Sequence, residues 1–534
     1  MSTDFGPPAT LPLAAIEHRG SYEATAARIA RRTALFHMPP GLVLPLIGGL
    51  LVLVADTQAL ALIPLQGSLV TTYHLSATQA AWTLSAASIA TCAMVPILAR
   101  LSDRFGLRRL FLVSLGLVTI GQLVCSLAGN FEVLVIGRSV LGCSAGAALV
   151  FSLIRETSKN EHELNRNSGV ITSAIGGGIA LSFLVGGAVL RLHGSVSDFF
   201  WIVTAVCAAL WLLSWLFLND SPVRARSRVD WLGAALLAGA LVSLVLAVSQ
   251  GNAWGWTATS IVTLFIVGGA LAVAWTLWEL RVAAPMVNLR VVSRRTIWPA
   301  LVVYGIANSL GIYTSLTVSG YVQTPSIAGY GMSASPLMAG VYLLPISIPI
   351  ALGGFLAGPI IRRIGAGVCL TAGVVVIVAD EISFAYNHDS VLEIVVGTFV
   401  FGSAYSLVNT AATASFMMGA RKGEYGMIAS AAAAALALGA SVGPAIYVAV
   451  LTSKFSLIPG TQTAVPAESN YRTILVYAAV IGVVALIAAL AGRRARFSHG
   501  FTADAVALTE TATAPEAATR AGAGPGAAPE AAAV

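Results

Sequence analysis

The dominant feature of the sequence is a series of long apolar runs separated by short polar segments. Each run can cross a bilayer as a helix, because about 20 helical residues span the ~30 Å hydrocarbon layer. Open β-sheets are excluded, since their edges cannot be hydrated in lipid. We therefore predict an all-α polytopic membrane protein. The fourteen expected spans are residues 42–65, 79–98, 110–128, 133–154, 170–190, 199–218, 231–248, 258–278, 297–318, 337–361, 366–385, 391–417, 427–451 and 474–490.

The composition supports a membrane location. Hydrophobic residues make up 57% of the chain and charged residues only 10%, whereas soluble domains carry roughly 25% charged residues. The net charge of +7 does not indicate nucleic-acid binding. The basic residues lie in short segments between spans, where they meet anionic lipid headgroups. The expected macromolecular environment is therefore the lipid bilayer, with no nucleic-acid partner.

The distribution of basic residues predicts the orientation. An even number of spans places both termini on one side, and short cytoplasmic loops are enriched in Lys and Arg. Of the 30 Lys and Arg residues, all but four then fall on the cytoplasmic side. The four are Arg138, Arg191, Lys454 and Arg472. We expect a multi-pass protein of the cytoplasmic membrane with both termini in the cytoplasm.

The segment 99–109, ARLSDRFGLRR, is expected to form a tight loop between the second and third spans. Its spacing, Gly/Ala-x-x-x-Asp-Arg-x-Gly-x-Arg-Arg, resembles the loop between helices two and three of the major facilitator superfamily of transporters. The resemblance implies a cytoplasmic gate, in which the aspartate bonds across to the start of the thirteenth helix near Tyr425. The expected gate residues are Asp103, Arg104, Gly106, Arg108 and Arg109.

The sequence also repeats itself. Residues 358–365 align with 99–106 at an offset of 259 residues, and Gly178 aligns with Gly439 at an offset of 261. Two related halves are typical of transporters that bind substrate between them. The layout resembles the fourteen-helix drug:proton antiporters of the superfamily, which have two six-helix bundles plus two inserted helices. The expected parts are a cytoplasmic leader (1–40), an N-terminal bundle (41–220), the inserted helices and linker (221–296), a C-terminal bundle (297–495) and a disordered cytoplasmic tail (496–534).

Asp56 is the most informative acidic residue, because it lies inside the first span. A carboxylate facing lipid is unfavourable by about 2.5 kcal/mol or more, so it should face a cavity, pair with a cation or bind a proton. An apolar environment favours its neutral form, which suits a proton carrier. The surrounding sequence, with Gln58 beside it, resembles the first-helix motif of the family. The alternative is a polar residue that caps a break near Pro64.

Arg138 is the only basic residue deep inside an expected span. The segment from Arg138 to Gly146 resembles the fourth-helix motif of the family, where the arginine is linked to proton transfer. Arg138 is therefore a candidate partner for Asp56; the alternative is an arginine that reaches the outer surface. Gly142 and Gly146 lie one turn apart and permit close helix packing.

Further polar residues and small residues complete the candidate sites. Asn308, Tyr405 and Asn409 could line a cavity or join helices. Asp380 and Glu381 are expected near the outer interface as hydrated groups, with a second proton or cation site as the alternative. The fifth span has Ser182-Phe183 where such antiporters have Gly-Pro. The further packing residues are Gly178, Gly186, Gly187, Gly439, Gly443 and Pro444.

These features predict a secondary transporter that exports small organic compounds in exchange for protons and acts as a monomer, not an enzyme. The sequence holds no nucleotide-binding Gly-x-x-x-x-Gly-Lys-Ser/Thr motif. The cysteines and histidines have no metal-ligand spacing, so we expect no metal and no cofactor. The alternatives are an importer or facilitator on the same fold and a transporter-like sensor without flux. A lipid-modifying enzyme is disfavoured because its histidines would need to cluster.

Overall fold

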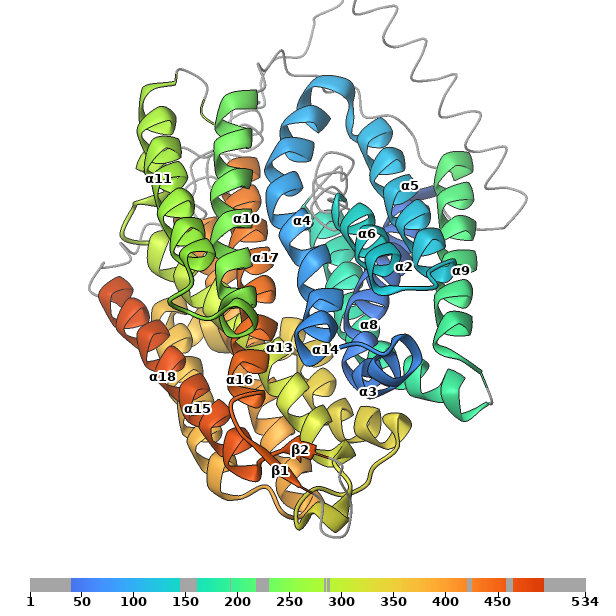
Figure 1. The fold of residues 1–534 in the computed structure, drawn as a ribbon. Helices are drawn as coiled ribbons and strands as arrows, with labels where there is room; N and C mark the ends of the chain where they lie inside the picture. The colour runs from blue at the N-terminus through green and yellow to red at the C-terminus, as the bar shows by residue number, and fades with distance from the viewer. Residues whose placement is uncertain are drawn as a thin grey trace, which may run out of the picture. The chain divides into compact units, whose positions relative to one another are not determined.

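The structure, a computed structural model, describes residues 40–144, 161–192, 194–217, 230–282, 285, 289–419, 425–457 and 464–493. It is helical apart from one antiparallel pair of short strands (Figure 1). In order, the elements are α2 (Pro40–Leu60), α3 (Leu62–Tyr73), α4 (Ala77–Phe105), α5 (Leu107–Ser126), α6 (Phe131–Gly142), α8 (Glu161–Arg191), α9 (Val196–Phe217), α10 (Trp231–Trp254), α11 (Thr259–Arg281), α12 (Leu289–Val292), α13 (Trp298–Gln323), η1 (Ser326–Ala328), α14 (Pro336–Ile364), α15 (Ala366–Tyr386), α16 (Val391–Gly419), α17 (Tyr425–Leu451), β1 (Phe455–Leu457), β2 (Ala464–Pro466) and α18 (Glu468–Arg493).

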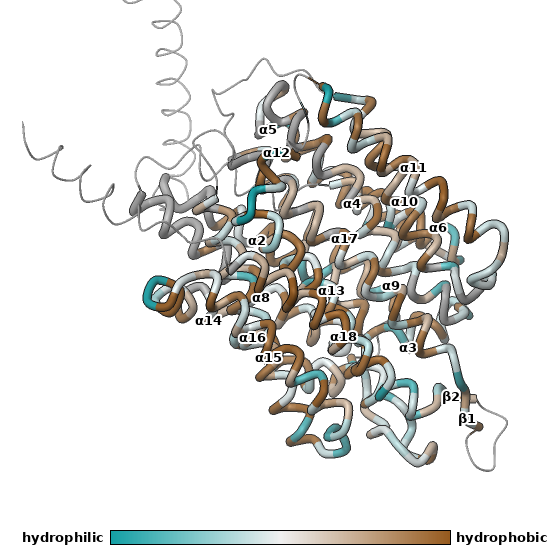
Figure 2. The backbone as a smooth tube through the Cα atoms, turned by 90° about the vertical axis from the view of Figure 1, so that its left-hand side faces the viewer, coloured by the Kyte–Doolittle hydropathy of each residue, from teal (hydrophilic) through white to brown (hydrophobic). Residues whose placement is uncertain are grey.

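Each expected span overlaps a helix in the described part of the chain; in the span 133–154 the helix α6 is described only to Gly142. Eleven of these helices are long and apolar enough to cross a membrane, and the bent pair of α2 and α3 would bring the number to 12. The other two are α4, which has 29 residues, and α6, which is described over 12 residues only. Apolar residues run along the helices, and polar residues gather at several connecting turns (Figure 2). Fourteen spans remain a prediction.

The first span is broken at Ala61, where α2 and α3 meet at a bend of 45°. Pro64 follows in the first turn of α3. A proline has no N–H, and its ring crowds the carbonyl group four residues earlier. That carbonyl belongs to Leu60, the last residue of α2. The expected break near Pro64 is therefore present.

The expected loop over residues 99–109 is wrong in its extent. Helix α4 continues to Phe105 and α5 begins at Leu107, so only Gly106 interrupts the two helices. Gly106 has φ 92° and ψ 140°, a backbone conformation that residues with a Cβ rarely adopt. The physical reason is that bilayer thickness limits the apolar run but not the helix. The charged end of α4 continues as helix beyond the apolar residues.

The internal repeat extends to the helix boundaries. Adding the offset of the loop repeat to the bounds of α4 reproduces the bounds of α14. Helix α5 maps onto α15 in the same way, to within one residue. Gly365 has φ 89° and ψ 146°, nearly the backbone conformation of Gly106. The two segments therefore share a local structure as well as a sequence pattern.

Contacts between helices follow the same repeat. Helix α4 packs against α17, and α8 packs against α14. In the repeat, α4 corresponds to α14 and α8 corresponds to α17. The contact of α4 with α17 therefore corresponds to the contact of α14 with α8. Helix α10 packs against α11 and also against both α4 and α17. The pair α10 and α11 is therefore attached at the contact between the repeats.

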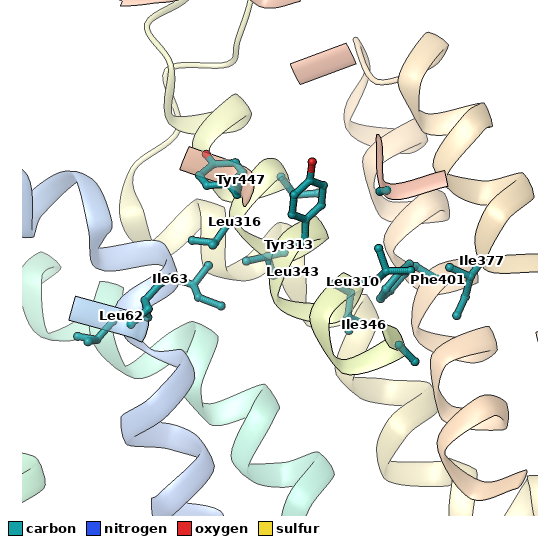
Figure 3. Close-up of a cluster of buried hydrophobic side chains, with 14 of the residues drawn as sticks. Leu62, Ile63, Leu310, Tyr313, Leu316, Leu343, Ile346, Ile377, Phe401 and Tyr447 are labelled. Atoms are coloured by element: carbon teal, nitrogen blue, oxygen red, sulfur yellow. The ribbon is translucent and has the colours of Figure 1, made fainter. Parts of the chain in front are cut away.

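Buried apolar residues join α3 to α13 (Figure 3). Leu62 and Ile63 of α3 belong to the same buried cluster as Leu310 and Tyr313 of α13. Ser319 on α13 donates a hydrogen bond to the Ile63 carbonyl at 3.2 Å. This contact holds the start of α3, just after the break in the first span, against α13.

Candidate functional site

Asp56 lies near the end of α2, close to α8 and to residues of the second repeat. A Cβ added at Gly178 on α8 would lie 3.1 Å from the Asp56 Cβ. The Asp56 side chain is partly exposed, but its Oδ2 atom is buried without a hydrogen-bond partner in the described residues. Its charge is close enough to act on the hydroxyl groups of Tyr304 and Tyr405, on α13 and α16. The carboxylate therefore lies beside α8 and within electrostatic range of two tyrosines on α13 and α16.

Helix α2 is held against α8 beside this carboxylate. The Thr57 hydroxyl donates to the Leu53 carbonyl at 2.7 Å and approaches the Gly178 carbonyl at 3.3 Å. The absence of a side chain at Gly178 permits this approach, because a Cβ there would lie 2.7 Å from the Leu53 carbonyl oxygen. Gly178 thus permits the close approach of α2 and α8 beside Asp56.

The structure brings Asn308, Tyr405 and Asn409 into one hydrogen-bonded network. The Tyr405 hydroxyl donates to Asn308 Oδ1 at 2.7 Å. Asn308 Nδ2 donates to Asn409 Oδ1 at 3.2 Å and to the Tyr304 carbonyl at 2.8 Å. Asn409 Nδ2 donates to the Tyr405 carbonyl at 2.9 Å. The network joins α13 to α16 and lies within electrostatic range of Asp56.

Arg138 on α6 is 1% exposed. Its Nε donates to the Thr83 carbonyl at 2.7 Å, and its Nη1 donates to the Gln58 carbonyl at 3.4 Å. The alternative of an arginine that reaches the outer surface is therefore wrong for this conformation. Gln58 is buried, and its Oε1 has no hydrogen-bond partner among the described residues. The guanidinium thus contacts the backbone two residues after Asp56; its pairing with the carboxylate remains a prediction.

The expected gate residues are described only in part. Asp103 and Arg104 lie in the last turns of α4, and their side chains fall outside the described atoms. The Arg108 Nη2 donates to the Trp215 carbonyl on α9 at 2.9 Å, and Arg109 is exposed. Helix α17 begins at Tyr425, as expected, and packs against α4. The bond from Asp103 to this helix end remains a prediction.

The packing glycines lie at close contacts between helices. A side chain at Gly142 would meet the Ala87 backbone of α4, and one at Gly187 would meet Leu337 of α14. The atom nearest to an added Cβ would be Leu65 Cδ1 at Gly186, the Gly305 carbonyl oxygen at Gly439 and the Ser309 carbonyl oxygen at Gly443. Pro444 lies inside α17. Gly146 falls outside the described residues.

Glu381 differs from its expected position. The sequence predicts a hydrated group, but the structure places it 1% exposed on the inner face of α15. The Thr314 hydroxyl on α13 donates to Glu381 Oε1 at 2.5 Å, while Oε2 is buried without a described partner. Distance along the span does not reveal which helix face the side chain occupies. Successive residues point in different directions around a helix. Glu381 therefore points toward α13, while its neighbour Asp380 points elsewhere and is partly exposed.

Taken together, the site offers a carboxylate, two amides and two tyrosine hydroxyls near the contact between the repeats. Such groups can bind a proton, a cation or a polar part of an organic molecule. The described residues around Asp56 supply no nucleophile with an adjacent base, which acyl or phosphoryl transfer would require.

Comparison with known proteins supports this interpretation of the fold. A sequence profile described as Major Facilitator Superfamily matches residues 46–444. The chain is similar to "Multidrug resistance protein Stp" of Mycobacterium tuberculosis (strain CDC 1551 / Oshkosh), with 27% identity over 392 residues, 72% of this chain and 71% of that protein. It is also similar to "Puromycin resistance protein pur8" of Streptomyces alboniger, with 30% identity over 59% of this chain and 61% of that protein.

Solved structures share the fold at low sequence identity. The human organic anion transporter MFSD10 (TETRAN) has a TM-score of 0.58 and 15% identity, covering 85% of this chain and 100% of that chain. The nucleoside transporter NupG has a TM-score of 0.56 and 12% identity, covering 86% of this chain and 100% of that chain. At this identity the likeness concerns the fold alone.

Proposed function

Because the chain belongs to the Major Facilitator Superfamily, we propose that it is a secondary transporter that exports small organic compounds in exchange for protons. The multi-pass helical fold and the similarity to multidrug resistance proteins support transport of this kind. The proposed location is the cytoplasmic membrane, with both termini in the cytoplasm. The proposed active form is a monomer.

The observation that carries the proposal is the buried Oδ2 atom of Asp56, which has no described hydrogen-bond partner. A carboxylate without a partner in an apolar protein interior gains stability by binding a proton or a cation. Asp56 therefore gives one group on which the proton and a cationic substrate compete. Such competition couples the two fluxes, because only one of them occupies the carboxylate at a time.

The network of Asn308, Tyr405 and Asn409 would contribute the polar contacts of the substrate site. Its amide and hydroxyl groups already satisfy one another. An organic substrate can replace some of these hydrogen bonds with hydrogen bonds of its own. The net cost in free energy is small, because a typical intramolecular hydrogen bond contributes only about 0.5–1.5 kcal/mol. A site of this kind accepts several related compounds, which fits a broad substrate range.

Alternating access is the proposed cycle. The contacts of α4 with α17 and of α8 with α14 join the two repeats, and they are the contacts that must change when the repeats move. Arg138 would move with α2 and α4, since it bonds to a carbonyl group of each helix. Asp56 lies on α2 as well, so Arg138 would accompany it, and the change in the ease of protonation would come from the contacts that open and close between the repeats.

Proteoliposomes with an imposed pH gradient test the proposal. Protein reconstituted with a lipophilic fluorescent cation such as ethidium should move the dye only when the gradient is present. Asp56→Asn should abolish gradient-driven movement, because asparagine binds no proton and offers the cation no charge. Glu132→Gln is the matched control, since Glu132 is an exposed acid at the start of α6.

Gradient-driven transport by Asp56→Asn at the wild-type rate would contradict the assigned role of the carboxylate. Flux in the direction of import would favour the importer, and binding of the cation without flux by the wild-type protein would favour the sensor.

A further inference from the structure

A second group of polar side chains lies next to β2, remote in sequence from Asp56. A ring nitrogen of His388 and one carboxylate oxygen each of Asp389 and Glu468 lie within 4.8 Å of one another. His388 and Asp389 follow α15, and Glu468 is the first residue of α18 (Figure 1). The two acids are exposed, whereas His388 is 5% exposed. The cluster therefore has one buried ligand and two ligands that face solvent.

The protonation of the His388 ring follows from its contacts. Nδ1 lies 2.8 Å from the Phe384 carbonyl, which can only accept a hydrogen bond. In the neutral ring Nδ1 therefore carries the proton and Nε2 carries the lone pair. Nε2 is buried and has no hydrogen-bond partner within the described residues. Histidines that bind metals donate their other N–H to a carbonyl or carboxylate group in the same way.

The surrounding residues fix the positions of these ligands. The Tyr321 ring lies edge-on to the His388 ring, with centroids 4.7 Å apart. The Tyr321 hydroxyl donates to Asp389 Oδ1 at 3.1 Å. Glu468 follows β2, whose Pro466 carbonyl accepts a hydrogen bond from Tyr330. One tyrosine thus orients two of the ligands, and the strand positions the third.

We propose that His388, Asp389 and Glu468 form a binding site for a divalent transition-metal cation of the Zn²⁺ type. One imidazole with two carboxylates is a ligand set that zinc accepts, while Mg²⁺ and Ca²⁺ prefer oxygen ligands alone. Zinc binds such atoms at about 2.0–2.2 Å, so neighbouring ligand atoms lie about 3.4 Å apart in a tetrahedral site. The ligand atoms are at most 4.8 Å apart, so they need to approach one another by about 1.4 Å at most to reach that spacing.

Three protein ligands leave the fourth position of zinc for water. A bound cation would neutralise two neighbouring carboxylates and join the link between α15 and α16 to the start of α18. This inference is independent of the proposed export function.

The test is equilibrium dialysis of full-length, tag-free protein in detergent against ZnCl₂, with the bound metal measured by elemental analysis. Wild-type protein should bind one zinc ion per chain, and Glu468→Gln and Asp389→Asn should each weaken binding about tenfold or more. Both substitutions keep the side-chain shape at exposed positions, so folding is expected to be retained. The matched control is His74→Asn with Glu132→Gln, an exposed histidine and an exposed acid outside the cluster.

Thermal unfolding in the same detergent gives a second measurement. Zinc should raise the unfolding temperature of the wild-type and control proteins, because it binds the folded state. It should leave that of Glu468→Gln nearly unchanged, and MgCl₂ should have no such effect on any of them. The proposal is overturned if the wild type binds no zinc, or if Glu468→Gln and Asp389→Asn bind it as tightly as the control.

Discussion

Gly365 offers a direct test of the backbone conformation that the two repeats share. Its φ of 89° and ψ of 146° lie near the region that only glycine adopts readily. A Cβ at this position would meet no atom within 4 Å. Gly365→Ala therefore changes the backbone strain without creating a steric clash. The expected destabilisation is about 1–3 kcal/mol, which is about a 5- to 150-fold change in the unfolding equilibrium.

Gly269 provides the opposite control for the same substitution. A Cβ at Gly269 would also meet nothing within 4 Å, but this residue lies inside helix α11. Gly269→Ala should therefore stabilise the protein by about 0.5–1 kcal/mol, because alanine loses less backbone entropy in a helix. The two variants carry the same added methyl group and should differ in the sign of their effect.

Equilibrium unfolding in mixed micelles of a mild detergent and sodium dodecyl sulfate measures both changes. Tyrosine and tryptophan fluorescence follow the transition, and refolding on dilution of the denaturing detergent establishes reversibility. Equal or greater stability of Gly365→Ala relative to the wild type would refute the reasoning. So would equal changes in stability for Gly365→Ala and Gly269→Ala, because the effect would then not depend on backbone conformation.

Three further predictions concern the network, the packing and the gate. Tyr405→Phe should cost about 1–3 kcal/mol of stability by leaving Asn308 Oδ1 without its donor, and Tyr342→Phe, whose hydroxyl makes no hydrogen bond in the described structure, should match the wild type. Gly142→Leu should destabilise by about 1–3 kcal/mol because its side chain meets the Ala87 backbone, whereas Gly269→Leu should be well tolerated in the same unfolding assay. Asp103→Asn should slow transport in proteoliposomes while the protein stays folded, since it would remove the predicted gating contact of about 1–2 kcal/mol; transport at the wild-type rate would contradict the gate.

The helical fold was predictable because apolar runs of membrane length leave the backbone few alternatives. The relation between segments 99–106 and 358–365 was also readable, and it extends to the bounds of α4 and α14. The end of α4 was misjudged, because hydropathy reports where the chain leaves lipid and not where the helix ends. The bend at Ala61 followed from Pro64, whose missing N–H has a local effect.

The candidate sites were predictable only where one residue is unusual by itself. Asp56 and Arg138 are conspicuous because they interrupt apolar runs. Asn308, Tyr405 and Asn409 were chosen by polarity, but their mutual hydrogen bonds depend on how α13 and α16 pack. The cluster of His388 with Glu468 had no sequence signal, because its members lie on separate segments and share no short motif.

The position of α10 has a consequence for movement. This helix contacts both α4 and α17, one from each repeat. It cannot keep both contacts unchanged while α4 and α17 slide past each other. Its buried apolar residues include Ala234, Ala240, Val245 and Ala247, three of which have only a methyl side chain. Short side chains at a helix contact hinder shear little, so α10 can stay packed if α4 and α17 move as the proposed cycle requires.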